Sequence, residues 1–304
     1  MSDPVADAVR ALRAGDLALF PTETVYGLAA DAANSAAVAR IFEAKGRPRF
    51  NPLISHVSDR LAAERIARFD DRARALAEAF WPGPLTLVLP LGDASAVCDL
   101  ARAGLDTVAV RAPAHPLARA VLEAFGGPVV APSANRSGRP SPTRFADAVE
   151  ETGAAAAVAL DGGDCAVGLE STVVSVADEV RLLRPGAVTR AEIEAMVGPL
   201  AEAEADAKRS PGRLAAHYAP DAPVRINAID TRPGEAFIGF GAVDRGGFNL
   251  SPSGDLREAA ANLFRMLREA DRLRPEAIAV APVPGEGLGE AINDRLRRAA
   301  GHVG

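Results

Sequence analysis

Short apolar runs alternate with amphipathic stretches along the chain, and this pattern predicts an α/β fold. Residues 17–20 form an apolar run that reads as a buried strand, which Pro21 ends. Apolar residues then recur with helical spacing after Ser35, which can cap a helix. A glycine and two prolines within 46–52 forbid helix, so a stiff loop leads into the next apolar run at 53–57.

The same patterns continue through the following segments and complete an N-terminal domain. Bounded apolar runs predict strands at 85–89, 107–111, 129–131, 157–161, 171–176 and 180–183. Helical spacing predicts helices within 1–16 and at 59–80, 116–125 and 189–197, the last capped by Thr189. Residues 91–106 read as an irregular crossing. We therefore expect residues 1–198 to form a twisted mixed or parallel sheet flanked by helices.

A change of composition separates this domain from a second, smaller unit. Residues 199–222 read as a linker, because acidic residues solvate its start and prolines stiffen its end. Beyond the linker, the pattern predicts strands at 224–229, 236–241 and 277–281 and helices at 256–271 and 289–300. A length of 304 residues also favours two domains. We expect residues 223–304 to form a small Rossmann-like α/β domain.

The loop before the run at 53–57 carries three cations, Lys45, Arg47 and Arg49. Such a loop suits a polyanion, and the alternative is a solvated basic turn. Of the 34 lysine and arginine residues in the chain, only Lys45 and Lys208 are lysines. A lysine in a chain that otherwise uses arginine indicates a site that needs a compact ammonium group.

A second polar loop, rich in proline, serine and arginine, covers residues 132–142. By composition alone it is an ordinary turn. The alternative is a cradle for an anion or a nucleotide, because hydroxyl and backbone N–H groups gather there at a strand end.

Several familiar catalytic and binding motifs are absent from the sequence. Neither lysine lies in a G-x-x-x-x-G-K-[ST] phosphate loop, and none of the four histidines has a metal-binding spacing. Ser171 is not in a nucleophile elbow. The glycines at 285, 287 and 289 lack the spacing of a dinucleotide fingerprint. What remains is a nucleotide and small-molecule site built from loops at strand ends.

Composition indicates the cellular compartment and limits the kinds of binding partner that we expect. Cys98 and Cys165 are too few and too isolated for a disulfide framework or a metal knuckle. The N-terminal segment reads as an amphipathic helix, and no apolar run reaches the roughly 18 residues of a membrane span. The net charge of −6 argues against a protein that binds nucleic acid by bulk electrostatics. We expect a cytoplasmic protein with no membrane contact and no stable nucleic-acid binding.

Motifs in a fixed order over roughly residues 5–200 resemble those of the YrdC-like family, the L-threonylcarbamoyladenylate synthases. They are 22–28 (TETVYGL), 45–48 (KGRP), 51–56 (NPLISH), 107–111 (TVAVR), 132–135 (PSAN), 168–173 (GLESTV) and 184–186 (RPG). Residues 210–212 (SPG) and 217–220 (HYAP) are similar to the linker of the two-domain form of that family. The resemblance implies a nucleotidyltransferase with a C-terminal extension domain.

The resemblance also implies the reaction and its partners. L-threonine, bicarbonate and ATP give threonylcarbamoyl-AMP and pyrophosphate, and a downstream threonylcarbamoyl transferase uses the product to modify tRNA. Physically, the threonine amine must be neutral to take up CO2, and the carbamate must reach the α-phosphorus in line. Fixed cations and Mg²⁺ must neutralise the departing pyrophosphate. No set of magnesium ligands is identifiable in the sequence.

Family positions around the nucleotide are carried onto matching residues of this chain. Lys45 and Arg47 are expected to face the phosphates as catalytic cations, with Asn51 in support from the same loop. The remaining residues expected around ATP are Thr107, Ser133, Ser141 and Arg184. Tyr218 is a candidate contact from the linker, which in this family closes over the active site.

The amino-acid side of the site follows in the same way. Arg111 is expected to grip the threonine carboxylate through two parallel hydrogen bonds. Thr24, His56 and Ser171 are expected to line the threonine pocket. A neutral His56 could assist deprotonation of the amine, and the alternative is a structural histidine.

Two other functions are weighed against this one. An RNA-binding module could use the basic loops around 45–49 and 136–139, but the acidic total and the lack of interleaved aromatic residues weigh against it. A carbamoyl-adenylating module of a larger carbamoyltransferase would bring cysteine clusters, which the sequence does not contain.

Overall fold

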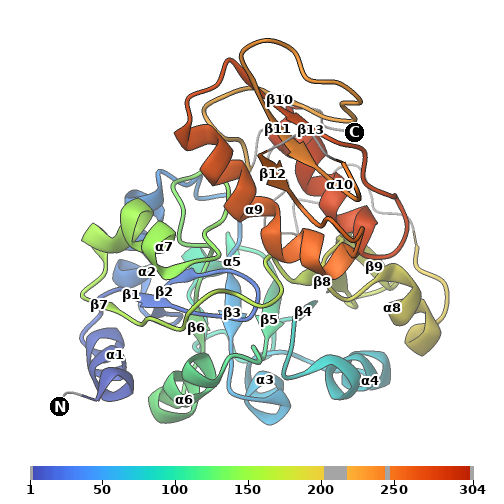
Figure 1. Cartoon of the computed structure of the whole chain (residues 1–304). Coiled ribbons are helices and arrows are strands. Elements are labelled where there is room, and N and C mark those ends of the chain that lie inside the picture. Colours follow the sequence, from blue (N-terminus) through green and yellow to red (C-terminus); the bar gives the residue numbers. More distant parts are fainter. Residues whose placement is uncertain (1–2, 202–217, 244–246, 302–304) are drawn as a thin grey trace.

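The computed structural model describes residues 3–201, 218–243 and 247–301, which form two α/β units (Figure 1). A nine-stranded mixed sheet lies in the first unit, and a four-stranded sheet lies in the second. This confirms the expected fold class of a large mixed sheet followed by a smaller α/β unit. Most of the predicted linker at 199–222 lies outside the described residues, so its boundaries stay a prediction.

The large sheet mixes parallel and antiparallel pairs in the order β7-β1-β2-β6-β3-β5-β4-β8-β9. Its strands are β1 Ala18–Phe20, β2 Gly27–Asp31, β3 Ile54–His56, β4 Leu85–Pro90, β5 Thr107–Arg111, β6 Val129–Val130, β7 Val158–Ala159, β8 Thr172–Ser175 and β9 Arg181–Arg184. The helices of this unit are α1 Pro4–Arg13, α2 Ser35–Lys45, α3 Arg60–Ile66, α4 Asp71–Phe80, α5 Asp99–Arg102, α6 Pro116–Phe125, α7 Phe145–Thr152 and α8 Arg190–Val197. A short 3-10 helix, Gly153–Ala155, follows α7.

The second unit has a wholly parallel sheet in the order β10-β13-β11-β12. Its strands are β10 Val224–Arg225, β11 Glu235–Gly239, β12 Phe248–Asn249 and β13 Ala277–Val280. Its helices are α9 Leu256–Arg272 and α10 Leu288–Ala299. Parallel strands joined through helices are typical of a Rossmann-like unit.

Local capping explains where several helices begin and end. The cap of α2 is Asn34 rather than Ser35, because the Asn34 carboxamide accepts from the backbone N–H groups of Ala36 and Ala37. Gly46 then ends α2 in a left-handed conformation at φ 59°. Helix α8 begins at the predicted cap, Thr189, which forms a capping box with Glu192.

Several element predictions need correction. The helix expected at 59–80 is two helices, because Ala67 is extended and pairs with Leu91 before Asp70 caps α4. Strand β2 was not predicted, because its glycine and alanine residues have low β propensity. Their burial depends on neighbouring strands that the sequence pattern does not show. Helices α5 and α7 and strand β12 were also missed, and β10 is shorter than the run at 224–229.

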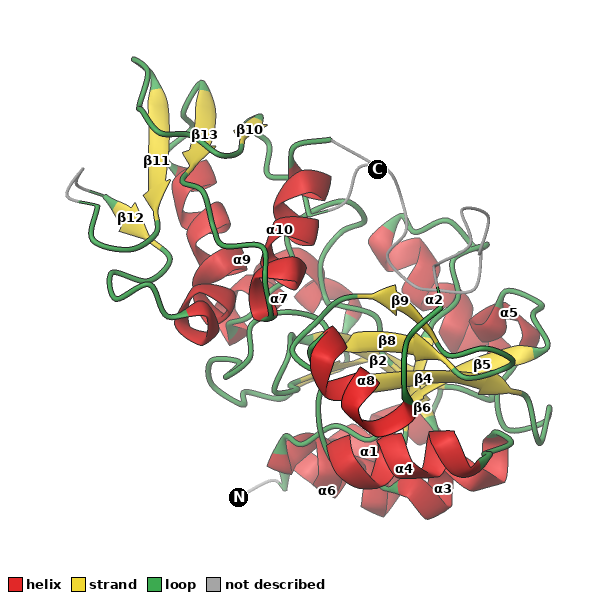
Figure 2. Cartoon of the chain, turned by 90° about the vertical axis from the view of Figure 1, so that its right-hand side faces the viewer, coloured by secondary structure: helices red, strands yellow, loops and turns green. Residues whose placement is uncertain are grey.

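The second unit lies on the side of the large sheet away from α1, α6, α3 and α4 (Figures 1 and 2). Helix α9 approaches the first unit closely: a Cβ added at Gly168 would lie 2.4 Å from Ala261 Cα. Ion pairs join α9 to α7, with Arg272 2.6 Å from Asp147 and Arg268 3.0 Å from Glu151. The two units are therefore packed together directly. No helix among residues 3–201, 218–243 and 247–301 is long and apolar enough to cross a membrane.

Candidate active site

A cavity opens at one edge of the large sheet, and sheet topology explains which residues meet there. Strands β3 and β5 are parallel and end at His56 and Arg111. Strand β4 is antiparallel to β5 and parallel to β8, so the start of β8 lies at that same edge. Strand β9 is antiparallel to β8 and returns Arg184 to it. The chain order alone does not reveal this convergence.

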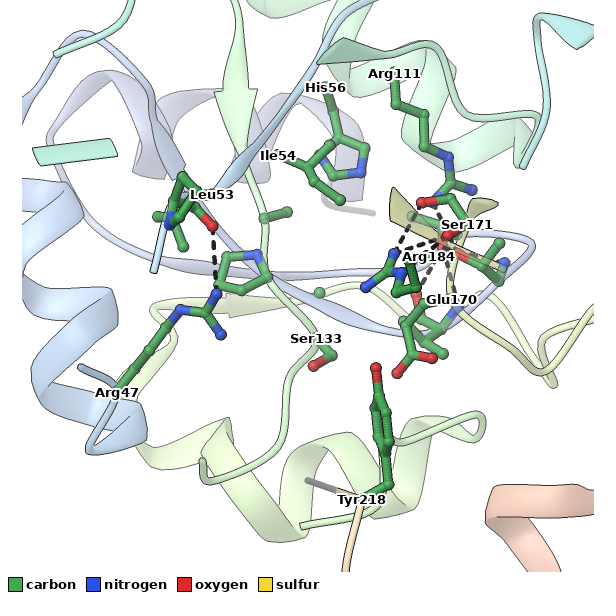
Figure 3. Close-up of a pocket in the computed structure, with 17 residues that line it drawn as sticks. Arg47, Leu53, Ile54, His56, Arg111, Ser133, Glu170, Ser171, Arg184 and Tyr218 are labelled. Carbon is green, nitrogen blue, oxygen red and sulfur yellow. Dashed lines mark hydrogen bonds between the residues drawn. The ribbon is translucent and has the colours of Figure 1, made fainter. Parts of the chain in front are cut away.

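The cavity draws its lining from the first unit and from Tyr218 of the predicted linker (Figure 3). The predicted site residues that line it are Thr24, Arg47, His56, Arg111, Ser133, Ser171, Arg184 and Tyr218. The space that the centre of a water molecule can reach is about 50 Å³. At roughly 10–15 Å³ for each water, this holds only a few waters. The cavity is therefore narrow in this conformation.

Arg184 and Ser171 form one wall. The Arg184 guanidinium donates to the Ser171 carbonyl oxygen at 3.1 and 2.9 Å and to the Ser171 hydroxyl at 3.2 Å. The same hydroxyl lies 2.7 Å from the Thr86 hydroxyl. Both residues are buried, so these bonds fix the Ser171 hydroxyl at the cavity edge.

Arg111 lines the cavity, and its hydrogen-bonding fork is partly engaged. Its Nη2 donates to the Glu23 carboxylate at 2.6 Å, and its Nη1 donates to the Thr24 hydroxyl at 2.9 Å. Its Nε donates to the Gly83 carbonyl oxygen at 3.1 Å. These bonds use three of the five N–H groups of a guanidinium, so the expected pair of parallel bonds to a carboxylate would come from the second N–H of each Nη. The three bonds hold the buried positive charge in place.

His56 is buried beside Arg111 and packs edge-on against Phe20, with ring centroids 6.2 Å apart. Burial, with the Arg111 charge, lowers the pKa of His56 to about 3. The imidazole is therefore neutral near pH 7. It is also too weak a base to take a proton from an ammonium group, which argues against the role in amine deprotonation.

Lys45 joins the two polar loops rather than lining the cavity. Its ammonium group donates to the Ser133 carbonyl oxygen at 2.5 Å and also to the Asn135 carbonyl oxygen. Burial lowers the pKa of Lys45 well below its usual value. Arg47 does line the cavity, and burial lowers its pKa to about 10, so it stays charged at neutral pH. Of the two expected catalytic cations, the structure places Arg47 at the cavity and Lys45 in its wall.

Three other expected ATP contacts lie off the cavity lining. Asn51 is 4% exposed, and its Nδ2 has no hydrogen-bond partner within the described residues. Ser141 is fully buried and donates to Glu170 at 2.5 Å. Thr107 begins β5 while Arg111 ends it, so Thr107 lies at the opposite edge of the sheet. The structure does not bring Thr107 together with the other site residues.

Tyr218 reaches the cavity from the predicted linker, shortly before the second unit. Its ring packs on Phe264 of α9, with centroids 5.2 Å apart, and its backbone adopts φ 66°. In Figure 3 the hydroxyl end of Tyr218 is directed toward Glu170, opposite Arg111 and His56. The neighbouring linker stretches 210–212 and 217 lie outside the described residues.

Two lining residues with polar side chains were not assigned from the sequence, Thr22 and Glu170. The Thr22 hydroxyl donates to the Val25 carbonyl oxygen at 2.6 Å and holds the turn that carries Thr24. Both residues fall inside the motifs at 22–28 and 168–173, so the sequence pointed to these segments but assigned no role to either residue.

The residues present do not form a resident metal site. No group of three or more His, Cys, Asp and Glu side chains in the described part of the chain is arranged to hold a metal ion. The Glu23 carboxylate is paired with Arg111, and Glu170 already accepts from Ser141. Such engaged carboxylates do not fit a magnesium site of their own.

Known proteins resemble the chain over both units. A family model described as "Telomere recombination" matches residues 10–186, and a model described as "Threonylcarbamoyl-AMP synthase, C-terminal domain" matches residues 188–301. The threonylcarbamoyl-AMP synthase of Bacillus subtilis is 39% identical over 99% of this chain and 94% of its own. That of Pyrococcus abyssi is 40% identical over 96% of this chain and 92% of its own.

A solved structure agrees with these relatives. The crystal structure of Pyrococcus abyssi Sua5 complexed with L-threonine has a TM-score of 0.90 at 37% identity. The match covers 98% of this chain and 94% of that one. Fold, domain pair and sequence thus agree over nearly the whole chain. The chain belongs to the family of threonylcarbamoyl-AMP synthases, in its two-domain form.

Proposed function

We propose that the cavity binds L-threonine, bicarbonate-derived CO2 and ATP, and makes threonylcarbamoyl-AMP with release of pyrophosphate. The observation that carries this proposal is the meeting of Arg47, Arg111 and Arg184 with the neutral His56 at one sheet edge. Three cations suit a substrate pair that brings a carboxylate and a triphosphate together.

The bonds balance as follows. The neutral amine of threonine attacks CO2, loses a proton to solvent and becomes a carbamate. A carbamate oxygen then attacks the α-phosphorus of ATP, and the bond to the β-phosphate oxygen breaks as pyrophosphate leaves. Because the leaving group gains charge, fixed guanidinium groups stabilise the transition state more than the ground state.

Most of the expected site residues then have a role in this proposal. Arg47 and Arg184 face the phosphates, while Arg111 attracts the threonine carboxylate by its buried charge. Thr24, Ser171 and the neutral His56 hydrogen-bond the amino acid. Lys45 orients the Ser133 loop, and Tyr218 closes the opposite wall.

Two requirements follow from the geometry. ATP is larger than the space inside this cavity, so nucleotide binding requires either that part of ATP lies outside the cavity or that the walls move apart. Magnesium enters with ATP on its phosphates, because residues 3–201, 218–243 and 247–301 offer no cluster of free carboxylates. We place the reaction in the cytoplasm, where a tRNA-modifying transferase would consume the product.

Pyrophosphate release from ATP and Mg²⁺ tests the proposal. We expect release that depends on both L-threonine and bicarbonate. Pyrophosphate release that does not depend on L-threonine would contradict threonine as the substrate. Salt-sensitive binding of tRNA without ATP turnover would instead support the RNA-binding alternative.

A further inference from the structure

The second unit sends one charged side chain into the wall of the active site. Arg295 lies on α10 and is fully buried, with no exposed surface. Its Nε donates to the Glu170 carboxylate at 2.9 Å. Glu170 is a lining residue of the cavity, so this contact crosses from one unit to the catalytic site of the other.

Arg295 also touches the second lining residue of that wall. Its guanidinium carbon lies 5.3 Å from the centre of the Tyr218 ring, within the range of a cation–π contact. Phe264 packs on the same ring. Arg295 therefore contacts both Glu170 and Tyr218 from behind the cavity wall.

The charged groups around Arg295 are joined by ion pairs. Glu170 and Asp294 both accept from Arg295, and Arg298 also pairs with Asp294. These two carboxylates and two guanidinium groups pair with one another, and the Arg184 guanidinium also acts on Glu170. Burial acts to raise the pKa of Glu170, but Arg295 and Arg184 lower it, so Glu170 stays ionised near pH 7.

Removing Arg295 would take away the guanidinium that is hydrogen-bonded to Glu170 and would leave Arg184 to balance this carboxylate. Among the described residues, the Ser141 hydroxyl also donates to Glu170, and it carries no charge. Glu170 would then compete with the substrate for Arg184, which is buried near it and now bonds Ser171. A free carboxylate at the wall would also repel the triphosphate.

We propose that Arg295 is a positioning residue for the nucleotide, which neutralises Glu170 from the second unit and so keeps Arg184 available to ATP. The inference rests on the proposed function for the identity of the ligand. It assigns the second unit a direct part in building the active site.

Three variants test the inference, with MgATP affinity measured by calorimetry alongside the ATP KM. Arg295→Met should weaken MgATP binding roughly tenfold or more, because a buried carboxylate loses its partner. Adding Glu170→Gln to Arg295→Met removes the charge and should restore affinity to within about threefold. The control is Arg190→Met, which breaks an exposed 2.9 Å pair with Glu290 between α8 and α10, away from the cavity, and should leave ATP affinity unchanged.

A pH series separates this role from mere support of the fold. In Arg295→Met the pKa of Glu170 should rise, so ATP affinity should recover as the pH falls from about 8 to about 6. The double variant should show no such recovery. Should Arg295→Met fail to fold, a folded double variant with near-wild-type ATP affinity would support charge neutralisation.

Unchanged ATP affinity in Arg295→Met would overturn the inference, and so would a double variant no better than the single one. An equal loss in Arg190→Met would also overturn it, because the cause would then be loosened packing between the units. Calorimetry needs no turnover. A wild-type protein that binds MgATP but releases no pyrophosphate would therefore contradict the proposed function. The MgATP affinities of the variants can still be compared in that case.

Discussion

The Lys45 ammonium group donates to the Ser133 carbonyl oxygen at 2.5 Å and thereby ties together the two polar loops of the first unit. Asn135 supplies a second carbonyl acceptor. A buried ammonium group with two carbonyl partners is costly to create and costly to remove. Lys45 therefore supports the catalytic site through the shape of the Ser133 loop.

We expect Lys45→Met to lower both stability and ATP affinity, because two buried carbonyl groups lose their donor. The stability loss should be about 1–3 kcal/mol in chemical denaturation. Arg49→Ala is the matched control, since Arg49 is an exposed cation of the same loop and should change stability by less than about 0.5 kcal/mol. Equal losses of stability in the two variants would contradict the claim that Lys45 holds the Ser133 loop in place.

Arg111→Lys should raise the KM for threonine far more than the KM for ATP. Lysine keeps the charge but cannot bond Glu23, Thr24 and the Gly83 carbonyl at once, as the guanidinium does. Steady-state kinetics with each substrate varied in turn measures the two effects. If both KM values rose alike, Arg111 could not be assigned to the amino acid.

The buried His56 should make the fold sensitive to mild acid. The pKa of His56 falls from 6.5 to about 3 on folding, so as the pH drops the unfolded chain binds the proton first. The stability that depends on neutral His56 is thus complete above about pH 7.5 and declines between pH 6.5 and about 3. At pH 5.5 the loss from this group should be about 1.4 kcal/mol.

The check is the free energy of unfolding at pH 7.5 and pH 5.5 in wild type and in His56→Asn. The variant should lose less stability between the two pH values, by about that amount. Carboxylates elsewhere titrate in both proteins and cancel in the comparison. Identical pH dependence would mean that His56 is not buried as described.

Gly168→Ala should loosen the packing between the two units. The added methyl group would meet Ala261 Cα at 2.4 Å, and the residue has φ +72°. Gly163 has a similar φ of +75° but open space around it, so Gly163→Ala costs only the backbone strain of about 1 kcal/mol. Gly168→Ala should cost about 1–3 kcal/mol more in chemical denaturation. Equal costs would show that α9 does not press on Gly168.

Much of the site could be predicted because its residues follow strand ends in the sequence. Arg111 and Arg184 each end an apolar run, and the edge of an α/β sheet gathers such residues. Thr107, which was expected near ATP from the family resemblance, begins its strand and lies at the far edge. Knowing which end of a strand reaches the site requires the pairing direction, which an apolar run does not contain.

Contacts that join distant segments could not be predicted. The bonds from Lys45 to Ser133 and from Arg295 to Glu170 link residues 88 and 125 positions apart. A charged residue in a helical pattern reads as a solvated one, and only the packing of the two units shows that Arg295 is buried. Strand β2 was missed for a similar reason, since its alanines are buried by neighbours on both sides.

The most direct test of the central claim is mass spectrometry of the adenylate formed from ATP, Mg²⁺, L-threonine and ¹³C-labelled bicarbonate. We predict a threonine-containing adenylate that carries the ¹³C label, formed together with pyrophosphate and absent when threonine is omitted. An adenylate without the label, or one that forms without threonine, would contradict the assignment of this cavity to threonylcarbamoyl-AMP synthesis.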